Sequence, residues 1–540
     1  MISVIGFLVV LAPLVIVHEF GHFLMAKLFN VKAEAFSVGF GPVIFQRKFG
    51  ETDFRASIIP LGGYVKLLGE DPTREMTDEE KKRALHTQAP WKRFFIFFGG
   101  PLFNFLWAAL VFMVMMLIGE PQVSSVIGRV VPDSPAAVAG LVAGDQVISV
   151  GGKPVRKFEE LVQEVSDRPN SSVPLEVLRD SKTVVLSVHT DSEDGYSIYG
   201  EEKRVGAIDG IFANSRNTRL GISDPASVAA KAGLKTGDEI TAINGTAVKS
   251  WEEIEKIEPQ LSTNPVELKI HSADNTDRTV SFALPKKGVA DRLAAVGIHS
   301  IELFVEKVVS GSPAEHSGMH AGDRLISVQG VAVQSFLDLK INIQKNGEAQ
   351  GLVKIDFERE GKIQEISIVP TGTTERDPSL KKRTQFTVGI MPFQSLNEPV
   401  TFIERVTNPF TLVWRGFDRM FELSARNFIS FGKMLTGQVS VKGLGGPISI
   451  GKLAGDSLTR GWIEFLRMMA LLSVGLGVLN VLPVPVLDGG HILLLVIEVI
   501  RGRSLSMRQL EMVQRVGLAM IMLLMMIAMR NDLSRLPIFN

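Results

Sequence analysis

The chain of 540 residues has no cysteine, so disulfide bonds and cysteine-based zinc sites are excluded. It also has no excess of either charge, because 58 lysines and arginines balance 58 aspartates and glutamates. A nucleic-acid-binding domain should be basic, so we expect no nucleic acid among the partners. Histidine is scarce as well: there are nine, and His18 and His22 have the spacing of metal ligands in the H-E-x-x-H pattern.

Long uncharged runs are the most prominent feature that the sequence does have. They cover residues 1–17, 94–118 and 468–487, and a fourth run at 512–529 is interrupted only by Arg515. Runs of this length are typical of helices that span a bilayer. We therefore predict about four transmembrane helices, at residues 1–29, 94–118, 463–500 and 512–530. The first run lacks the basic start of a signal peptide, so we expect it to be retained.

The first predicted span carries the pattern H-E-x-x-H at residues 18–22. Histidines four positions apart lie on one face of a helix, where His18 and His22 can hold one Zn²⁺. The adjacent Glu19 can accept a proton from water that the metal activates. Three such polar groups are costly inside a membrane helix and by default mark a functional site. The alternative is a satisfied polar cluster in a buried helix.

A catalytic zinc usually has a third protein ligand, for which Asp488 is the candidate. It closes the third apolar run, in the segment N-V-L-P-V-P-V-L-D-G-G-H at residues 480–491, at the predicted depth of the first motif. The two prolines break the helix there, and irregular backbone at membrane depth is tolerated where it lines a cavity. Asp488 could also cap a helix over residues 489–500, and the two roles are compatible. His491 is a second candidate ligand.

The connection between the first two spans predicts β-structure followed by a charged segment. Residues 30–70 hold short β-prone runs at 35–38, 43–45, 54–59 and 64–68, separated by glycine and proline, which indicates hairpins associated with the membrane. Residues 71–93 are charged, and we expect them to be helical and cytoplasmic. In the second span, Gly99, Gly100, Pro101 and Asn104 indicate either a kink with close helix packing or a direct part in the chemistry.

Residues 120–391 contain an internal repeat. Similar fragments at 134–145, 224–238 and 312–323 end in Gly-Asp, and each precedes an apolar strand, a turn and a helix. The pattern predicts three modules, at 120–210, 211–298 and 299–391. It resembles PDZ domains of the circularly permuted bacterial kind, which implies a groove for peptide C-termini in each module. The candidate carboxylate-binding positions are Val205, Gly206, Val296, Gly297, Val388 and Gly389. One or more modules could instead act as spacers or as a size filter.

Two further patterns relate the chain to the lipid bilayer. Residues 400–440 have apolar residues at helical spacing with basic residues between them, which predicts an amphipathic helix at the membrane surface or against the soluble modules. Lysine and arginine are concentrated in residues 25–93 and 501–515. By the positive-inside rule both connections are cytoplasmic, which puts the three modules and both termini on the other side.

The motifs together resemble the site-2 protease family of intramembrane zinc metalloproteases. The resemblance rests on H-E-x-G-H at 18–22, N-x-x-P-x-P-x-L-D-G-G at 480–490 and the PDZ-like modules between them, with F-S-x-G-F-G-P at 36–42 and P-L-G-G-Y-V-K at 60–66. It implies a multi-domain α+β protein of the bacterial inner membrane, with three PDZ-like modules inserted between spans 2 and 3. The implied activity is cleavage of transmembrane segments of single-pass proteins, including anti-sigma factors and signal-peptide remnants. It further implies Zn²⁺ on His18, His22 and Asp488, catalysis by Glu19 and substrate contact by Asn480.

The number of modules departs from the family pattern. The members that the chain most resembles carry two PDZ modules, whereas this chain has three, so the resemblance does not imply how the soluble part is arranged. Two other functions compete with proteolysis. A non-enzymatic, membrane-anchored PDZ scaffold would leave Glu19 without a purpose. A transporter or metal carrier could use His18, His22 and Asp488, but three PDZ-like modules disfavour it.

Overall fold

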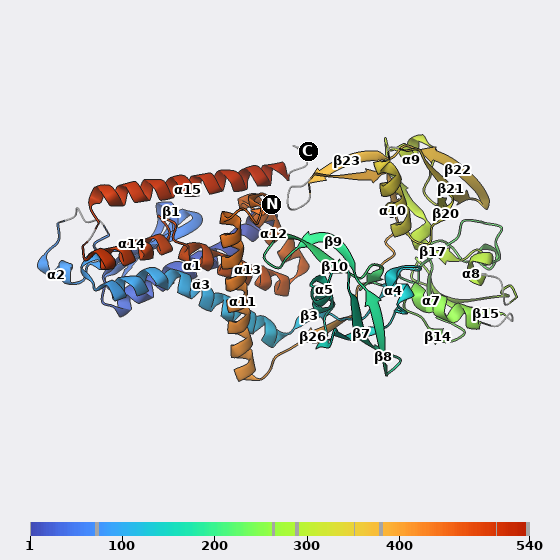
Figure 1. Ribbon diagram of the computed structural model, residues 1–540, viewed down its shortest axis with the longest axis horizontal. Coiled ribbons are helices and arrows are strands. Elements are labelled where there is room, and N and C mark those ends of the chain that lie inside the picture. The colour runs from blue at the N-terminus through green and yellow to red at the C-terminus, as the bar shows by residue number, and fades with distance from the viewer. Residues whose placement is uncertain are drawn as a thin grey trace.

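The computed structural model describes residues 2–70, 75–261, 265–286, 291–349, 351–376, 382–503 and 505–535. Figure 1 shows an elongated molecule with long helices at one end and β-rich units at the other. The chain crosses between the two parts through β3 (Glu120–Val123) and returns through β26 (Thr401–Glu404), and these strands pair antiparallel. Residues 71–74, the start of the predicted charged segment, lie outside the described part.

Four described helices are long and apolar enough to cross a membrane, which agrees with the predicted number. They are α1 (Ile2–Leu28), α3 (Pro90–Ile118), α13 (Trp462–Val481) and α15 (Met507–Ser534). The segment predicted at 463–500 is divided into two helices at the break that its prolines predict. Because Pro483 and Pro485 cannot donate helical hydrogen bonds, α13 ends at Val481, residues 482–487 are not helical, and a separate helix α14 (Asp488–Arg501) follows.

The connection between α1 and α3 forms a small curled sheet from β1 (Ala33–Phe49) and β2 (Thr52–Leu67). Ser37 pairs with both Tyr64 and Arg55, so residues 35–38 lie between two segments of β2. The second half of β1 then folds back on β2, as in the pairing of Lys48 with Asp53. The four short runs predicted from the sequence are therefore the segments that pair.

The helix expected over residues 71–93 is reduced to α2 (Asp78–Lys82) and a 3₁₀ turn, η1 (Leu85–Thr87). The backbone beyond α2 is used in tertiary pairing, because Arg83 accepts from the Lys32 N–H and Leu85 donates to the Leu68 carbonyl. The Arg83 guanidinium also makes two hydrogen bonds of 2.7 Å to Glu51 in the β1–β2 turn. These contacts tie the segment to the sheet and end the helix.

The three sequence repeats form three units, each around its own apolar core. Each contains a four-stranded sheet of the same order, β6-β5-β7-β8, β14-β13-β15-β16 and β20-β19-β21-β22. The first unit comprises β4 (Arg129–Val130), α4 (Pro135–Val138), β5 (Gln146–Val150), β6 (Lys153–Pro154), α5 (Phe158–Ser166), β7 (Ser172–Arg179), β8 (Lys182–His189), β9 (Asp191–Tyr196), β10 (Glu202–Ala207) and β11 (Ile211–Phe212). The second comprises β12 (Leu220–Gly221), α6 (Val228–Lys231), β13 (Glu239–Ile243), β14 (Thr246–Ala247), α7 (Trp251–Ile257), η2 (Glu258–Gln260), β15 (Val266–His271), β16 (Asp277–Phe282), α8 (Arg292–Ala295), β17 (His299–Ser300) and η3 (Ile301–Leu303). The third comprises β18 (Val305–Val308), α9 (Pro313–His316), β19 (Arg324–Val328), β20 (Val331–Ala332), α10 (Phe336–Glu348), β21 (Val353–Arg359), β22 (Lys362–Ile368), β23 (Thr371–Arg376), β24 (Lys382–Thr387) and β25 (Ile390–Pro392).

The first and last strands of each unit pair with one another, β4 with β11, β12 with β17 and β18 with β25. The closing strands β11 and β17 therefore belong to the units that precede them, just beyond the predicted module boundaries at 210 and 298. The aspartate that ends each repeat motif has a structural part: Asp145, Asp238 and Asp323 are nearly fully buried. Each accepts a hydrogen bond from the backbone N–H three residues earlier and pairs with an arginine on the sheet.

The predicted amphipathic helix at 400–440 is α11 (Pro409–Leu435), which crosses the long helices in Figure 1. Its Met420 and Phe417 join the core that α3 and α13 share, while Phe410 and Trp414 stay exposed. A further helix, α12 (Pro447–Arg460), follows the 3₁₀ turn η4 (Val441–Gly443) and was not predicted. It packs against α1 so closely that a Cβ on Gly6 would lie 2.8 Å from the Gly455 nitrogen.

The N-terminus of α12 is capped by Asp532 of α15 and not by a neighbouring residue. The buried Asp532 carboxylate accepts from the backbone N–H groups of Gly446, Ile448 and Ser449 at 2.9–3.1 Å, and from the Ser449 hydroxyl. Free N–H groups at a helix start need such an acceptor, and negative charge is favoured there. The side chain therefore fixes the end of α15 to α12, and through α12 to α1.

We expect Asp532→Asn to weaken the attachment of α12 to α15 by about 1–3 kcal/mol. The substitution replaces a carboxylate by an amide and so removes one acceptor oxygen and the negative charge. Hydrogen exchange of the amides of residues 446–449, followed by mass spectrometry of the detergent-purified chain, measures the effect. Asp418→Asn, on the exposed face of α11, is the control and should leave exchange unchanged. Equal protection in the Asp532 variant and the unmodified chain would show that the cap is not what holds α12.

Candidate metal centre

The centre is built where α1 and α3 cross. A Cβ on Gly21 would lie 2.2 Å from the Gly99 carbonyl oxygen, so glycine at both positions lets the two backbones touch. At the next residue of α3, a Cβ on Gly100 would lie 2.4 Å from His22 Nε2 and 2.6 Å from His18 Cε1. The imidazoles occupy the space that the missing side chain leaves. The sequence left open whether these glycines serve helix packing or the chemistry. In the structure they serve both, because they let the helices touch and leave room for the histidines.

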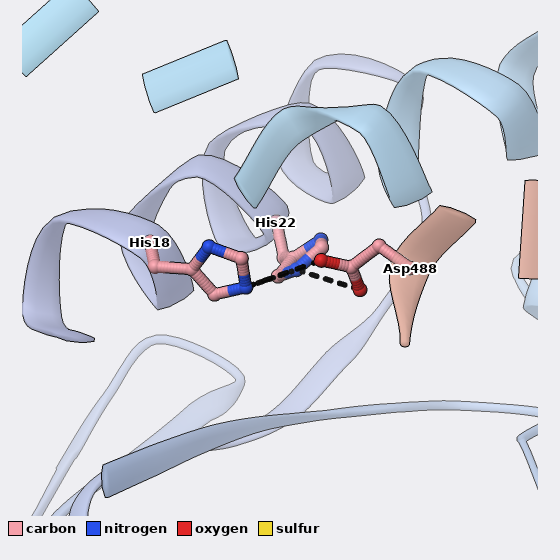
Figure 2. Close-up of side chains that lie close together, drawn as sticks. All are labelled: His18, His22 and Asp488. Carbon is pink, nitrogen blue, oxygen red and sulfur yellow. Dashed lines mark hydrogen bonds and ion pairs between the residues drawn. The ribbon is translucent and has the colours of Figure 1, made fainter. Parts of the chain in front are cut away.

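His18, His22 and Asp488 converge on one point, as Figure 2 shows. The two Nε2 atoms are 3.3 Å apart, and the Asp488 carboxylate oxygens lie 3.2 Å from His18 Nε2 and 3.4 Å from His22 Nε2. All three side chains are at least four-fifths buried. Among the described residues these form the group of histidine and carboxylate side chains whose ligand atoms could hold a metal ion.

The opposite nitrogen of each imidazole has its own partner. His22 Nδ1 lies 2.8 Å from the Ile96 carbonyl oxygen, and His18 Nδ1 lies 3.0 Å from the Asn104 carboxamide nitrogen. The Asn104 oxygen is buried and has no hydrogen-bond partner. Turning the amide by 180° would present that oxygen to a protonated His18 Nδ1, which satisfies both groups. Both Nε2 atoms are then free to bind a metal ion. Each Nδ1–H donates to an oxygen behind the ring, that of the Ile96 carbonyl for His22 and that of the Asn104 amide for His18.

These distances fit a tetrahedral zinc ion. Zinc binds histidine nitrogen and carboxylate oxygen at about 2.0–2.2 Å, so neighbouring ligand atoms of a tetrahedron are roughly 3.3–3.5 Å apart. The observed separations of 3.2–3.4 Å agree with that spacing. Two imidazoles and one carboxylate also leave a fourth position, the arrangement found in catalytic zinc sites and not in structural ones.

The break after α13 brings Asp488 to the histidines. Helix α14 starts immediately after the non-helical segment, with Leu487 as the capping residue and no side-chain cap, so Asp488 as an N-cap is wrong. Its carboxylate is directed to the imidazoles. Gly489 and Gly490 make this turn possible, because a Cβ on either would lie within 2.4 Å of backbone oxygens in residues 481–484. His491 stacks on Phe97 and is not among the grouped ligands.

Glu19 and Asn480 also lie at the centre. The Glu19 carboxylate has a hydrogen bond with the Val65 backbone and interacts electrostatically with His18, His22 and Asp488. A Cβ on Gly63 would lie 3.1 Å from Glu19 Cγ, so the last part of β2 runs directly beside it. Asn480 Nδ2 is 3.4 Å from His18 Nε2.

The predicted carboxylate-binding positions lie in the repeated units, away from these residues. Gly297 and Gly389 have positive φ and each precedes the closing strand of its unit, facing Ser227 and Ser312. In the first unit the matching glycine is Gly210, which faces Ser134. Placing Val205 and Gly206 in such a loop is wrong: both lie within β10, and Gly206 is packed against the Val165 and Arg168 carbonyls. Val205-Gly206 has the same letters as the Val-Gly pairs of the other two units, whereas the structurally matching glycine stands four residues later, after Asp209.

Sequence reasoning did not assign Asn104, Gly100 or Ile96 to the histidines. Asn104 is fully buried in an apolar span, and a buried amide is a signal that a polar partner exists. Gly100 and the Ile96 carbonyl gave no signal of a partner, because their contacts depend on how α1 and α3 cross.

Comparisons with known proteins match nearly the full length of the chain. The model of the family described as "Peptidase family M50" matches residues 6–524. "Protease RseP" of Yersinia pestis is 29% identical over 540 residues, covering 99% of this chain and 99% of its own. "Regulator of sigma-E protease RseP" of Escherichia coli K12 is 29% identical and covers 98% of each chain. A protein of Pasteurella multocida with the words zinc metalloprotease in its name is 29% identical and covers 99% of each chain.

We expect Gly100→Ala to lower the zinc content of the purified chain roughly tenfold or more, because the added Cβ would displace both imidazoles. Elemental analysis after dialysis against trace zinc measures this. Gly475→Ala, in the membrane helix α13 with open space around it, is the matched control and should keep full occupancy. Full zinc in the Gly100 variant would mean that the imidazoles do not depend on this contact.

Proposed function

Because the chain belongs to peptidase family M50, we propose that it is an intramembrane zinc endopeptidase that acts in regulated intramembrane proteolysis. The family match confirms the resemblance to site-2 proteases, and the names of the three relatives agree with a zinc metalloprotease. None of these comparisons supports the non-enzymatic scaffold. The observation that carries the proposal is the convergence of His18, His22 and Asp488 from two helices that the sequence separates by more than 460 positions.

Each residue of the centre would have its own part in peptide hydrolysis. His18, His22 and Asp488 would hold Zn²⁺, which when bound lowers the pKa of water and polarises the scissile carbonyl. Glu19 is placed to accept the proton of the attacking water and to pass it to the leaving nitrogen. The Asn480 amide, beside His18, can donate to the oxygen that becomes negative in the transition state.

The substrates we propose are single-pass transmembrane proteins, such as anti-sigma factors and signal-peptide remnants. A peptide bond in a helix is shielded by its own backbone, so the substrate must become extended before it is cut. Residues 63–66 of β2 lie beside Glu19 and pair on one side with residues 35–38. An extended substrate could add to this sheet as a strand and bring its peptide bond to the centre.

Glu19→Gln should abolish cleavage of a model transmembrane substrate but keep zinc, because only the proton acceptor is lost. His18→Ala and Asp488→Ala should lose both zinc and activity. Mass spectrometry of the products in detergent and elemental analysis of the same preparations measure the two properties.

Near-normal turnover by Glu19→Gln would refute the assigned mechanism. Full zinc occupancy after either ligand substitution would refute the ligand set. The exposed Glu267→Gln in the second unit serves as the control and should change neither quantity.

We further propose that the three repeated units are PDZ-like modules. The support is the identical strand order of their sheets and the pairing of first with last strand in each. Their positive-φ glycines, Gly210, Gly297 and Gly389, are then the candidate positions for binding peptide C-termini. The modules could also exclude substrates with large folded ectodomains, since specificity is a difference of affinities and both devices can act together.

We place the units on the extracytoplasmic side of the inner membrane. The basic connections 25–93 and 501–515 predict this side, and Figure 1 shows α2 and the start of α15 at the end of the helical part opposite the units. A cysteine at the exposed Lys235 should react with an impermeant thiol reagent in cells with a permeabilised outer layer. The chain has no other cysteine, so labelling reports this position alone. Labelling at Lys82 in place of Lys235 would invert the topology.

A further inference from the structure

A surface pocket of about 360 Å³ lies where the first repeated unit, β26 and the start of α11 meet. Its size is within the range of about 300–1,000 Å³ that is usual for small-molecule sites. The charged residues that line it are Arg156 of the first unit, Glu404 and Arg405 at the end of β26, and Arg415 on α11. Thr407 and Thr411 also line it.

The pocket has an excess of positive charge. Glu404 is paired twice, with Lys157 Nζ at 2.7 Å and with Arg415 Nη1 at 3.4 Å. Burial alone would raise the pKa of Glu404, but the hydrogen bond from Lys157 and the charges of Lys157, Arg415 and Arg156 hold it below its usual value. The Glu404 carboxylate therefore interacts with three cations, and a fourth, Arg405, lines the same pocket.

Two of these cations form no ion pair within 4 Å with a carboxylate in the part of the chain that the structure describes. Arg156 lies over the Phe402 ring, with its guanidinium carbon 5.3 Å from the ring centre. Arg405 donates to the Ile118 carbonyl from Nε at 3.1 Å and from Nη2 at 2.7 Å. Both interactions orient a guanidinium group without neutralising its charge, so each can still bind an anion.

The pocket is at the end of a membrane span. Ile118, to which Arg405 is bonded, is the last residue of α3, a helix long and apolar enough to cross the bilayer. Phe410 and Trp414, which precede the lining residues Thr411 and Arg415 on the first turns of α11, expose 86% and 73% of their surface. Aromatic side chains of this kind are enriched at the membrane–water interface. The arginines are therefore at the depth of lipid headgroups.

We propose that this pocket binds the phosphate of an anionic phospholipid headgroup in the leaflet that faces the repeated units. Guanidinium groups match the geometry of phosphate oxygens, and three of them converge here from separate segments. A bound headgroup would contact Arg156 of the first unit and Arg415 of α11 together. It would thereby hold the first unit against the membrane surface, close to the paired strands β3 and β26 through which the chain enters and leaves the units.

Calorimetric titration of the full chain in a neutral detergent tests the proposal. The probes are dihexanoyl phosphatidylglycerol, dihexanoyl phosphatidylcholine and inorganic phosphate. We expect saturable binding of the phosphatidylglycerol, and binding about tenfold weaker or more in Arg156→Gln/Arg415→Gln, because two cations near the headgroup are lost. Arg426→Gln is the matched control: it lies three turns further along α11 on nearly the same face, about 16 Å away, and should bind like the unmodified chain.

Each other outcome overturns part of the proposal. Equal affinity of the double variant and the unmodified chain, with unchanged thermal unfolding midpoints, would show that these arginines do not form the site. Phosphatidylcholine binding as tightly as phosphatidylglycerol would remove the requirement for net negative charge. Inorganic phosphate binding as tightly as the lipid would mean that the pocket recognises free phosphate and not a membrane headgroup.

Discussion

The contact between α1 and α3 at Gly21, Gly99 and Gly100 is the constraint on which the centre depends. In a bilayer the lipid tails are as apolar as leucine, so helices gain little from burying apolar surface against each other and must associate by close packing. Here the absence of two side chains brings the backbones into contact, and the absence of a third leaves room for two imidazoles. Glycine also allows close backbone contact where Gly6 lies against Gly455 of α12. It does so again where Gly489 and Gly490 form the turn that places Asp488 beside the histidines.

How far the sequence predicts this structure depends on how local each signal is. His18, Glu19 and His22 lie within about one helical turn, and the prolines before Asp488 interrupt an apolar run, so the grouping of His18, His22 and Asp488 could be predicted from short segments. Helix α12 could not, because the carboxylate that caps it belongs to α15, far along the chain. The position of Asn104 behind His18 was also hidden, since it depends on how two spans cross. In the first repeat, the Val-Gly pair at 205–206 matched the sequence of the other repeats, whereas the matching position in the structure is Gly210.

The units and the helices are joined by charge as well as by two strands. Glu120, the first residue of β3, is almost fully buried and pairs with Arg419 of α11 at 2.8 Å. Lys157 of the first unit pairs with Glu404 of β26. Ionic contacts beside the paired strands β3 and β26 give the first unit a defined orientation on α11. The second unit follows the first along the chain, and the third leads back to β26 through residues 393–400. If the units restrict access to the centre, their position relative to the helices is therefore set by β3, β26 and the ion pairs beside them.

Metal binding and helix packing are coupled in such a centre. The three ligand atoms lie 3.2–3.4 Å apart, and holding a carboxylate and two imidazoles so close in a buried place is costly unless a cation is shared between them. Because two ligands come from α1 and one from the start of α14, the free energy of binding the ion is also free energy that holds α14 against the α1–α3 pair. The loop at 482–487, which has few regular hydrogen bonds of its own, gains most from that restraint. An ion held by His18, His22 and Asp488 would thus stabilise the irregular segment that brings Asp488 to the histidines.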